Sequence, residues 1–195
     1  MKKLMMTVLS CGMMLGACAQ TAALKAIELN EPSLDRGKPV MQALSERRST
    51  REFADRMLSL QDLSDLVWAA NGINRPESGK RTAPSAMNRQ DVKVYVCTRD
   101  GSYLYDPAAA ILEPLTAGDV RPDGAPVCIV LVTDEGETWS ALDAGTVSQN
   151  ISLFCAGAGL ATYPRASMDR DALRQALQLS AKQELMLCHP VGYFK

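Results

Sequence analysis

The chain has 195 residues, and its 21 Lys and Arg residues nearly balance its 22 Asp and Glu residues, for a formal net charge of −1. This balance excludes the basic class of nucleic-acid-binding domains, so we expect no nucleic-acid partner. The length is that of one ordinary domain with a proper core, and we expect a single domain.

The first twenty residues have the layout of a secretory signal. Two lysines precede an uncharged, mostly apolar run over residues 4–15, which is too short to span a membrane well. The Leu-Gly-Ala-Cys sequence that ends at Cys18 is typical of a lipobox, and it predicts a signal peptide over residues 1–17 with lipidation of Cys18. Small residues on both sides of this cysteine leave ordinary cleavage open. In both cases we expect export, either to the periplasm or to a membrane held only through the lipid.

Residues 18–37 contain several turn-forming residues and predict a tether, which leaves a folded domain over residues 38–195. A first helix is predicted from Pro39 to Arg47, with the proline in the first helical position. A second is predicted from Ser59, which can cap it, to Gly72.

The rest of the chain alternates strand and helix patterns without a regular repeat. Residues 91–96 alternate polar and apolar, which predicts a strand with one face in solvent. Residues 127–132 are continuously apolar, as in a central strand that is covered on both faces. A helix over residues 137–158 is so apolar that it must be buried or meet a partner subunit. The other predicted elements are a strand at 103–105, a helix at 171–179 and a strand at 184–194. Together these elements predict an α+β domain.

Conventional catalytic side chains are scarce. The only histidine is His189, for which we expect a structural role, and the sequence has no paired-histidine metal motif and no G-x-S-x-G elbow. Four cysteines follow Cys18, and their apolar surroundings predict packing rather than disulfides: Cys97, Cys128, Cys155 and Cys188. Any chemistry should therefore come from a bound cofactor.

Two segments could bind such a cofactor. Arg47, Ser49 and Arg51 alternate along a segment that follows a helix, so on an extended backbone they would present two guanidinium groups and a hydroxyl to a phosphate. The alternative is a solvated basic turn. In residues 84–90, Ser85 and Asn88 lie where a small-residue turn opens a short helix and could meet a polar ring edge, although an ordinary helix cap has the same pattern.

The two segments in this order resemble the nitroreductase-like family of FMN flavoproteins. Arg-Arg-Ser-Thr-Arg-Glu-Phe at 47–53 is similar to the family's phosphate-binding motif, and Pro-Ser-Ala-Met-Asn-Arg-Gln at 84–90 to its P-S-x-x-N-x-Q motif. Residues 66–75 and 103–107 are similar to segments of the subgroup related to azoline dehydrogenases. The resemblance extends to the closing strand at 190–193.

The resemblance implies a nitroreductase-like fold, with a central mixed or antiparallel sheet flanked by helices, and a homodimer that holds FMN at its interface. It implies that Arg47, Ser49 and Arg51 hold the FMN phosphate, with Arg48 acting mainly through its backbone. The other implied contacts are Ser85 and Asn88 on the flavin or its ribityl chain, the backbone amides of Ala166 and Ser167 near flavin N5, and Lys195 as the only cation after the closing strand.

The implied function is an FMN-dependent oxidoreductase of ping-pong type. A small-molecule donor would reduce the flavin, and a small acceptor such as a quinone or a nitro compound would reoxidise it. Two alternatives stay open: a flavin-dependent dehydrogenase of a peptide or other organic substrate, and a surface flavin-binding lipoprotein without turnover. The Pro-Trp that often follows the second motif is replaced by Asp91 and Val92, so the substrate pocket departs from the family pattern.

Overall fold

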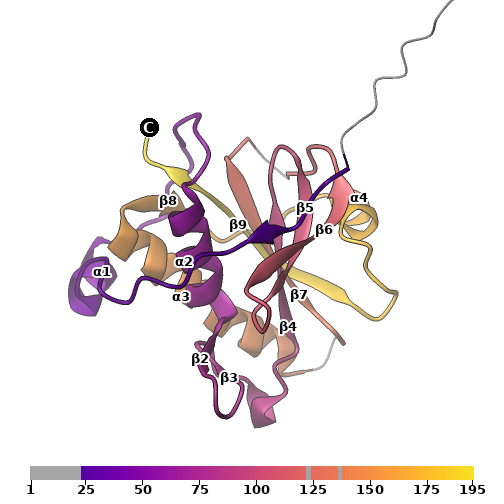
Figure 1. The fold of residues 1–195 in the computed structure, drawn as a ribbon, viewed down its shortest axis with the longest axis horizontal. Helices are drawn as coiled ribbons and strands as arrows, with labels where there is room; N and C mark the ends of the chain where they lie inside the picture. The colour runs from indigo at the N-terminus through magenta and orange to yellow at the C-terminus, as the bar shows by residue number, and fades with distance from the viewer. Residues whose placement is uncertain (1–22, 122–123, 136–137) are drawn as a thin grey trace, which may run out of the picture.

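A seven-stranded antiparallel sheet forms the centre of the molecule (Figure 1). The computed structural model describes residues 23–121, 124–135 and 138–195. In sheet order the strands are β1 (Ile27–Glu28), β6 (Ile111–Ala117), β5 (Gly101–Asp106), β4 (Val92–Cys97), β7 (Val127–Thr133), β9 (Glu184–Tyr193) and β8 (Leu160–Thr162). A separate hairpin consists of β2 (Ile73–Arg75) and β3 (Lys80–Arg81). The predicted α+β class and antiparallel sheet are confirmed.

Helices cover both faces of the sheet. On one face lie α2 (Leu60–Asn71) and α3 (Ser140–Ala158), with α1 (Val40–Glu46) packed against α3, and on the other lies α4 (Arg170–Ala176). Each face has its own apolar core. All seven residues of β7 are buried, as the continuously apolar run predicts for a central strand.

The prediction that the strand at 91–96 has one face in solvent is wrong. In β4 only Lys93 is partly exposed, although polar and apolar residues alternate at its start. The face expected to be wet carries Tyr95 and Cys97, which pack under Leu173 and Leu177 at α4. The alternation was misleading because aromatic and thiol side chains are compatible with burial.

Residues 27–37, part of the segment expected to form a tether, lie instead against the domain. We call residues 27–38 the N-terminal strap. It begins as β1 on the edge of β6, crosses α2, and ends where the Lys38 N–H donates to the Gly157 carbonyl. Arg36 holds the strap to α2 through Asp62 and Asp65. The predicted signal peptide and Cys18 lie outside the described residues.

The second helix begins and ends as predicted. The Ser59 side chain accepts a hydrogen bond from the Asp62 N–H, and the helix ends at Gly72. A Cβ atom on Gly72 would lie 2.5 Å from the Trp68 side chain, so only glycine fits there.

The four cysteines of the described region are buried and form no disulfide with one another, which confirms packing rather than a disulfide framework. Among the described residues no helix is both long and apolar enough to cross a membrane.

Candidate functional site

The arginine motif leaves α1 as extended backbone and lies beside β8. The Thr50 N–H donates to the Thr162 carbonyl at 3.0 Å, which fixes the middle of the motif. Arg47 and Arg48 line a cavity of about 580 Å³. The opposite walls of this cavity are formed by α3, β8 and the chain end, including Ser152, Thr162 and Phe194.

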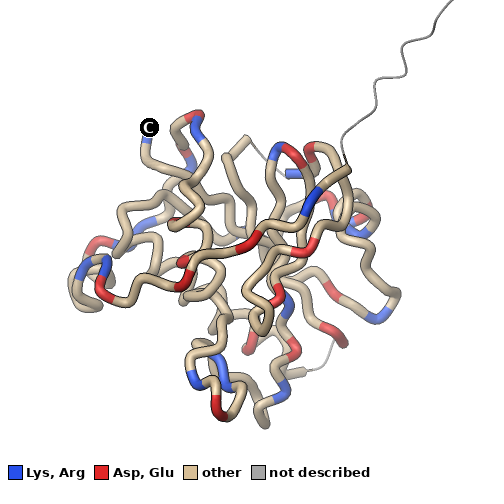
Figure 2. The backbone as a smooth tube through the Cα atoms, in the orientation of Figure 1, with Lys and Arg blue, Asp and Glu red and all other residues tan. Residues whose placement is uncertain are grey.

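The C-terminus lies beside this motif (Figures 1 and 2). Phe53 forms an antiparallel bridge with Phe194, and the Arg48 guanidinium lies 5.8 Å from the centroid of the Phe194 ring. Lys195 follows directly, so the predicted C-terminal cation lies at the same end of the molecule as the arginines.

The segment predicted to approach the flavin ring is connected to the arginine motif through Tyr163. The Arg51 guanidinium lies 4.7 Å from the centroid of the Tyr163 ring. Arg165 donates to the Tyr163 hydroxyl at 3.5 Å and to Ser167 Oγ at 3.3 Å. The exposed residues Ala166 and Ser167 therefore belong to the same end of the protomer as Arg51.

The arginine motif has the charge that a phosphate requires. Among the residues that the structure describes, Arg47, Arg48 and Arg51 form no salt bridge with a carboxylate, whereas Arg36 is paired with two aspartates. Glu46 lines the same cavity and is paired with Lys38. Exposed guanidinium groups that form no ion pair within the described residues favour a dianion such as a phosphate monoester. The residues present thus fit the phosphate of FMN.

The second motif is held at the start of α3. The Ala86 N–H donates to both carboxylate oxygens of Asp143 at 3.0 Å, and Thr146 Oγ1 donates to the Pro84 carbonyl at 3.1 Å. The short helix expected here is a single 3₁₀ turn over Ala86–Asn88. Its residue Met87 has a φ of 52° and is 80% exposed, so the segment projects as a loop and does not offer a row of helix amides.

The two predicted contact residues of this loop differ in their hydrogen bonding and exposure. Ser85 Oγ accepts a hydrogen bond from the Gln90 N–H at 2.9 Å, and so shapes the loop. Asn88 is exposed, has a φ of 57°, and accepts a hydrogen bond from the Gln90 side chain at 3.3 Å.

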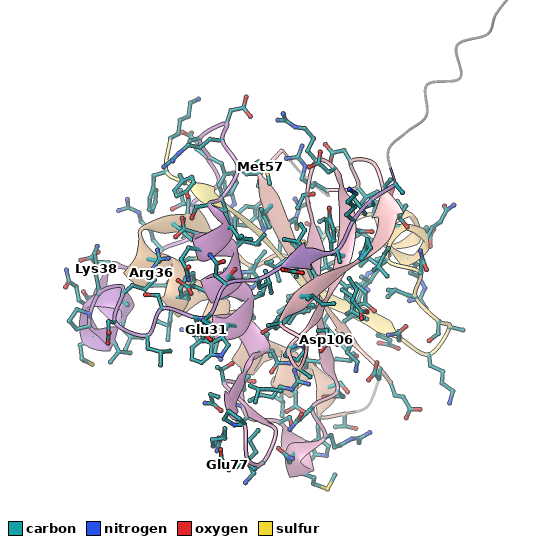
Figure 3. All side chains as sticks on the ribbon, viewed as in Figure 1. Glu31, Arg36, Lys38, Met57, Glu77 and Asp106 are labelled. Atoms are coloured by element: carbon teal, nitrogen blue, oxygen red, sulfur yellow. The ribbon has the colours of Figure 1, made fainter. Side chains whose placement is uncertain are left out.

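The two motifs lie at opposite ends of α3. Asp143 holds the second motif, while Ala156, thirteen positions later, lines the cavity of the first. At 1.5 Å per residue the two positions are about 20 Å apart along the axis, and at 3.6 residues per turn they lie on different sides of the helix. Figure 3 shows the same separation: Met57, just after the first motif, and Glu77, in the hairpin before the second, mark opposite ends of the molecule. Within one protomer the two motifs therefore lie at opposite ends of α3 and not side by side.

His189 is fully buried between α3 and β8. Its Nε2 lies 2.8 Å from Ser148 Oγ and its Nδ1 3.4 Å from Thr162 Oγ1. Burial lowers the pKa of His189 to about 4, so the ring is neutral at pH 7. Both ring nitrogens are occupied inside the core, which supports the structural role predicted for it.

Sequence reasoning missed several residues of the site. Lys38 and Tyr163 have no local signal, because the fold alone brings them to the arginine motif. Phe194 could have been found as the neighbour of Lys195. Asp143 also had a signal, because an acidic residue in the first turn of a predicted helix is placed to accept backbone N–H groups.

Comparison with known proteins gives consistent matches. The model of the Nitroreductase family matches residues 44–193. A crystal structure of a nitroreductase-like protein from Ralstonia eutropha JMP134 is 37% identical, covers 87% of this chain and 90% of its own, and has a TM-score of 0.83. A nitroreductase-like protein of Methanocaldococcus jannaschii is 26% identical over 85% of this chain and 96% of its own. A structure from Desulfovibrio desulfuricans, solved in complex with FMN, is 23% identical with a TM-score of 0.59, and covers 80% of this chain and 86% of its own.

Proposed function

The chain belongs to the nitroreductase family of FMN-dependent oxidoreductases, and from that premise we propose that two copies of it bind FMN between them. We propose further that the pair passes electrons from a small-molecule donor to a small organic acceptor, a quinone or a nitro compound. FMN supplies the redox chemistry, since its ring takes up and gives back the electrons, and the protein supplies binding and electrostatics.

The observation that carries this proposal is the position of the two motifs at opposite ends of α3. In a dimer with two-fold symmetry, a segment that meets a different segment of the partner subunit does so twice, once in each direction. The arginine motif of one protomer and residues 84–90 of the partner subunit can then face one FMN, and the dimer has two such sites.

The surface beside both motifs suits a second copy. Val40 and Met41 on α1 are 62% and 73% exposed, and Leu142 on α3 is 60% exposed. Trp139, just before α3, is 51% exposed. Val40 and Met41 lie near the first motif and Trp139 and Leu142 near the second, so exposed apolar side chains of the kind found at interfaces flank both motifs. A second copy would cover them and complete both flavin sites at once.

The proposed role of each residue in FMN binding follows from its position. Arg47, Arg48, Ser49, Arg51 and Lys195 hold the phosphate by charge and hydrogen bonds. The main-chain N–H groups of Ala166 and Ser167 face the ring, where they stabilise the negative charge of its reduced form. Ser85 and Asn88 of the partner subunit contact the ring or the ribityl chain.

Subunit complementation tests this arrangement. Arg47→Ala and Asn88→Ala each damage both sites of a homodimer, so each purified variant should be nearly colourless. In a heterodimer of the two variants, one site has both defects and the other has neither. After the two variants are mixed, unfolded and refolded together, FMN content should recover to about a quarter of the wild-type capacity.

The control is wild-type protein taken through the same unfolding and refolding, which should regain its full FMN content. No recovery in the mixture beside full recovery in the control would contradict a shared site.

The electron-transfer part of the proposal has its own test. A donor, NAD(P)H or dithionite, is added to the yellow protein under anaerobic conditions, followed by a quinone or a nitroaromatic. Bleaching by NAD(P)H and return of colour with the acceptor support the proposal, whereas a flavin that no donor reduces contradicts it.

A further inference from the structure

Two buried carboxyl groups lie behind the second motif. Asp143 on α3 accepts the Ala86 N–H with both oxygens, as described above. Asp91 follows the motif directly, and its Oδ2 accepts a hydrogen bond from Ser140 Oγ at 2.8 Å. The two aspartates are only 6% and 8% exposed.

The hydrogen bonds of this pair are incomplete if both groups are ionised. Asp91 Oδ1 is buried and has no hydrogen-bond partner. Ser140, which bonds Asp91, and Asp143 are three positions apart on α3, so the Asp143 carboxyl lies on the side of the helix that meets Asp91. Two carboxylates in this position would repel each other and leave a buried acceptor unsatisfied, which is costly. A single proton between them would remove both penalties.

The charged groups around the pair do not cancel this effect. Burial raises the pKa of Asp143, and the negative charge of Asp91 raises it further. The hydrogen bond from the Ala86 N–H and the positive charge of Arg89 lower it, but the net change is upward. On the neighbouring strand, Lys93 is paired with Asp134 at 3.5 Å. The groups from α3 and the loop thus make Asp143 easier to protonate than an ordinary aspartate.

We propose that Asp91 and Asp143 share one proton, and that this acid pair holds residues 84–90 in the shape that receives the flavin of the partner subunit. Both are positioning residues, since they act through the Ala86 backbone and touch no reacting atom. The second part of the inference rests on the proposed function, whereas the shared proton does not.

The pair couples the loop to pH. When the shared proton is lost, the carboxylates repel, and the Asp143 side chain and the loop it holds must move apart from Asp91. The shape of the loop is then no longer fixed, and FMN affinity falls as pH rises. An asparagine at either position has a permanent N–H donor, so it replaces the proton and removes the dependence on pH.

The shared proton is tested first by ¹³C NMR of the aspartate carboxyl carbons in the purified full chain. We expect the Asp143 carboxyl to titrate above the ordinary value of about 3.9. The signal should disappear in Asp143→Asn, or return toward the ordinary range in Asp91→Asn, where the like charge is gone. If every aspartate titrates at or below its ordinary value, the shared proton is disproved.

The role in flavin binding is tested by FMN fluorescence quenching between pH 5 and pH 9. Over this pH range the FMN affinity of the wild type should fall by a factor at least five times larger than that of Asp91→Asn or Asp143→Asn. The FMN phosphate titrates in the same way with all three proteins, so the comparison cancels its effect. Asp143→Ala should bind about tenfold more weakly at every pH, because Ala86 loses its acceptor. The control Asp171→Asn, at an exposed position of α4, should keep the wild-type profile.

The outcomes separate the two proposals. If the wild type and Asp143→Asn share one pH profile, the positioning role is wrong. If the raised titration is present but the wild type binds no FMN at any pH, the shared proton stands and the proposed function fails.

Discussion

The hydroxyl of Tyr193 donates a 2.5 Å hydrogen bond to Oδ2 of Asp62, and so joins the end of β9 to the first turn of α2. The other oxygen of Asp62 receives Arg36 from the strap at 2.5 Å. Burial raises the pKa of Asp62, but the hydrogen bonds from Tyr193, Ser59 and Arg36 lower it more, so the carboxylate stays ionised. Three segments distant in sequence thus meet at one negative charge, close to the end of the molecule that carries the arginine motif.

Removing Arg36 should therefore destabilise the fold. Arg36→Ala leaves Asp62 and Asp65 without their cation, and Asp65 is only 2% exposed. We therefore expect a loss of roughly 2–3 kcal/mol in the free energy of unfolding, measured with urea. Lys38→Ala is a matched control on the same strap, because the Lys38–Glu46 pair is exposed and should contribute less than about 1 kcal/mol. Equal losses in the two variants would show that Arg36 does not hold the strap.

Stability should also depend on His189 in mildly acidic solution. Its pKa is about 4 in the folded protein and about 6.5 when unfolded, so the unfolded chain binds the proton more readily. The neutral His189 ring therefore makes its full contribution to the free energy of unfolding above about pH 6.5. This contribution, on the order of 3 kcal/mol in all, is lost progressively as pH falls toward 4.

This dependence can be assigned without a variant that fails to fold. His189 is the only histidine of the chain, so its ring C–H signals in ¹H NMR report one residue. They should titrate near pH 4 in the folded protein, and urea midpoints should drop between pH 7 and pH 5. An imidazole that titrates at its ordinary value would mean that the ring reaches water or gains an acidic partner.

The parts of the fold that sequence reasoning predicted are those with a local cause. The cap at Ser59, the stop at Gly72 and the buried strand β7 each follow from neighbouring residues. The strap was missed because its order comes from Arg36 reaching aspartates more than twenty residues away.

The candidate site was predictable to the same extent. Residue types and spacing indicated a phosphate site and a flavin-contacting loop, but not the wide separation that α3 imposes on them. That separation depends on which end of the helix each segment meets, and no pattern within either motif contains this information. Asp91 and Asp143 were missed for a similar reason, since a shared proton depends on two residues that are 52 positions apart.

The lipobox prediction concerns residues outside the described part of the chain and can be tested by fractionation. Cys18→Ala removes the sulfur that a lipid would need, so a protein that is normally recovered with membranes should become soluble in the exported fraction. Cys11→Ala, inside the same leader, should leave the wild-type distribution unchanged. A wild type that is already soluble after export would instead indicate ordinary signal cleavage.

The two arginines should differ in their contribution to FMN binding. Arg47 lines the cavity, whereas the Arg51 guanidinium lies on the Tyr163 ring and is not among the cavity walls. Losing a charge-assisted hydrogen bond costs about 1.5–3 kcal/mol, so Arg51→Ala should weaken FMN binding by roughly 10- to 100-fold, as measured by fluorescence quenching. Arg47→Ala should weaken it at least as much, because Arg47 is itself one of the residues that line the cavity. Lys182→Ala removes an exposed cation after α4 and should change nothing, so an equal loss there would show only a general effect of charge. Unchanged affinity in both arginine variants would mean that the phosphate binds elsewhere.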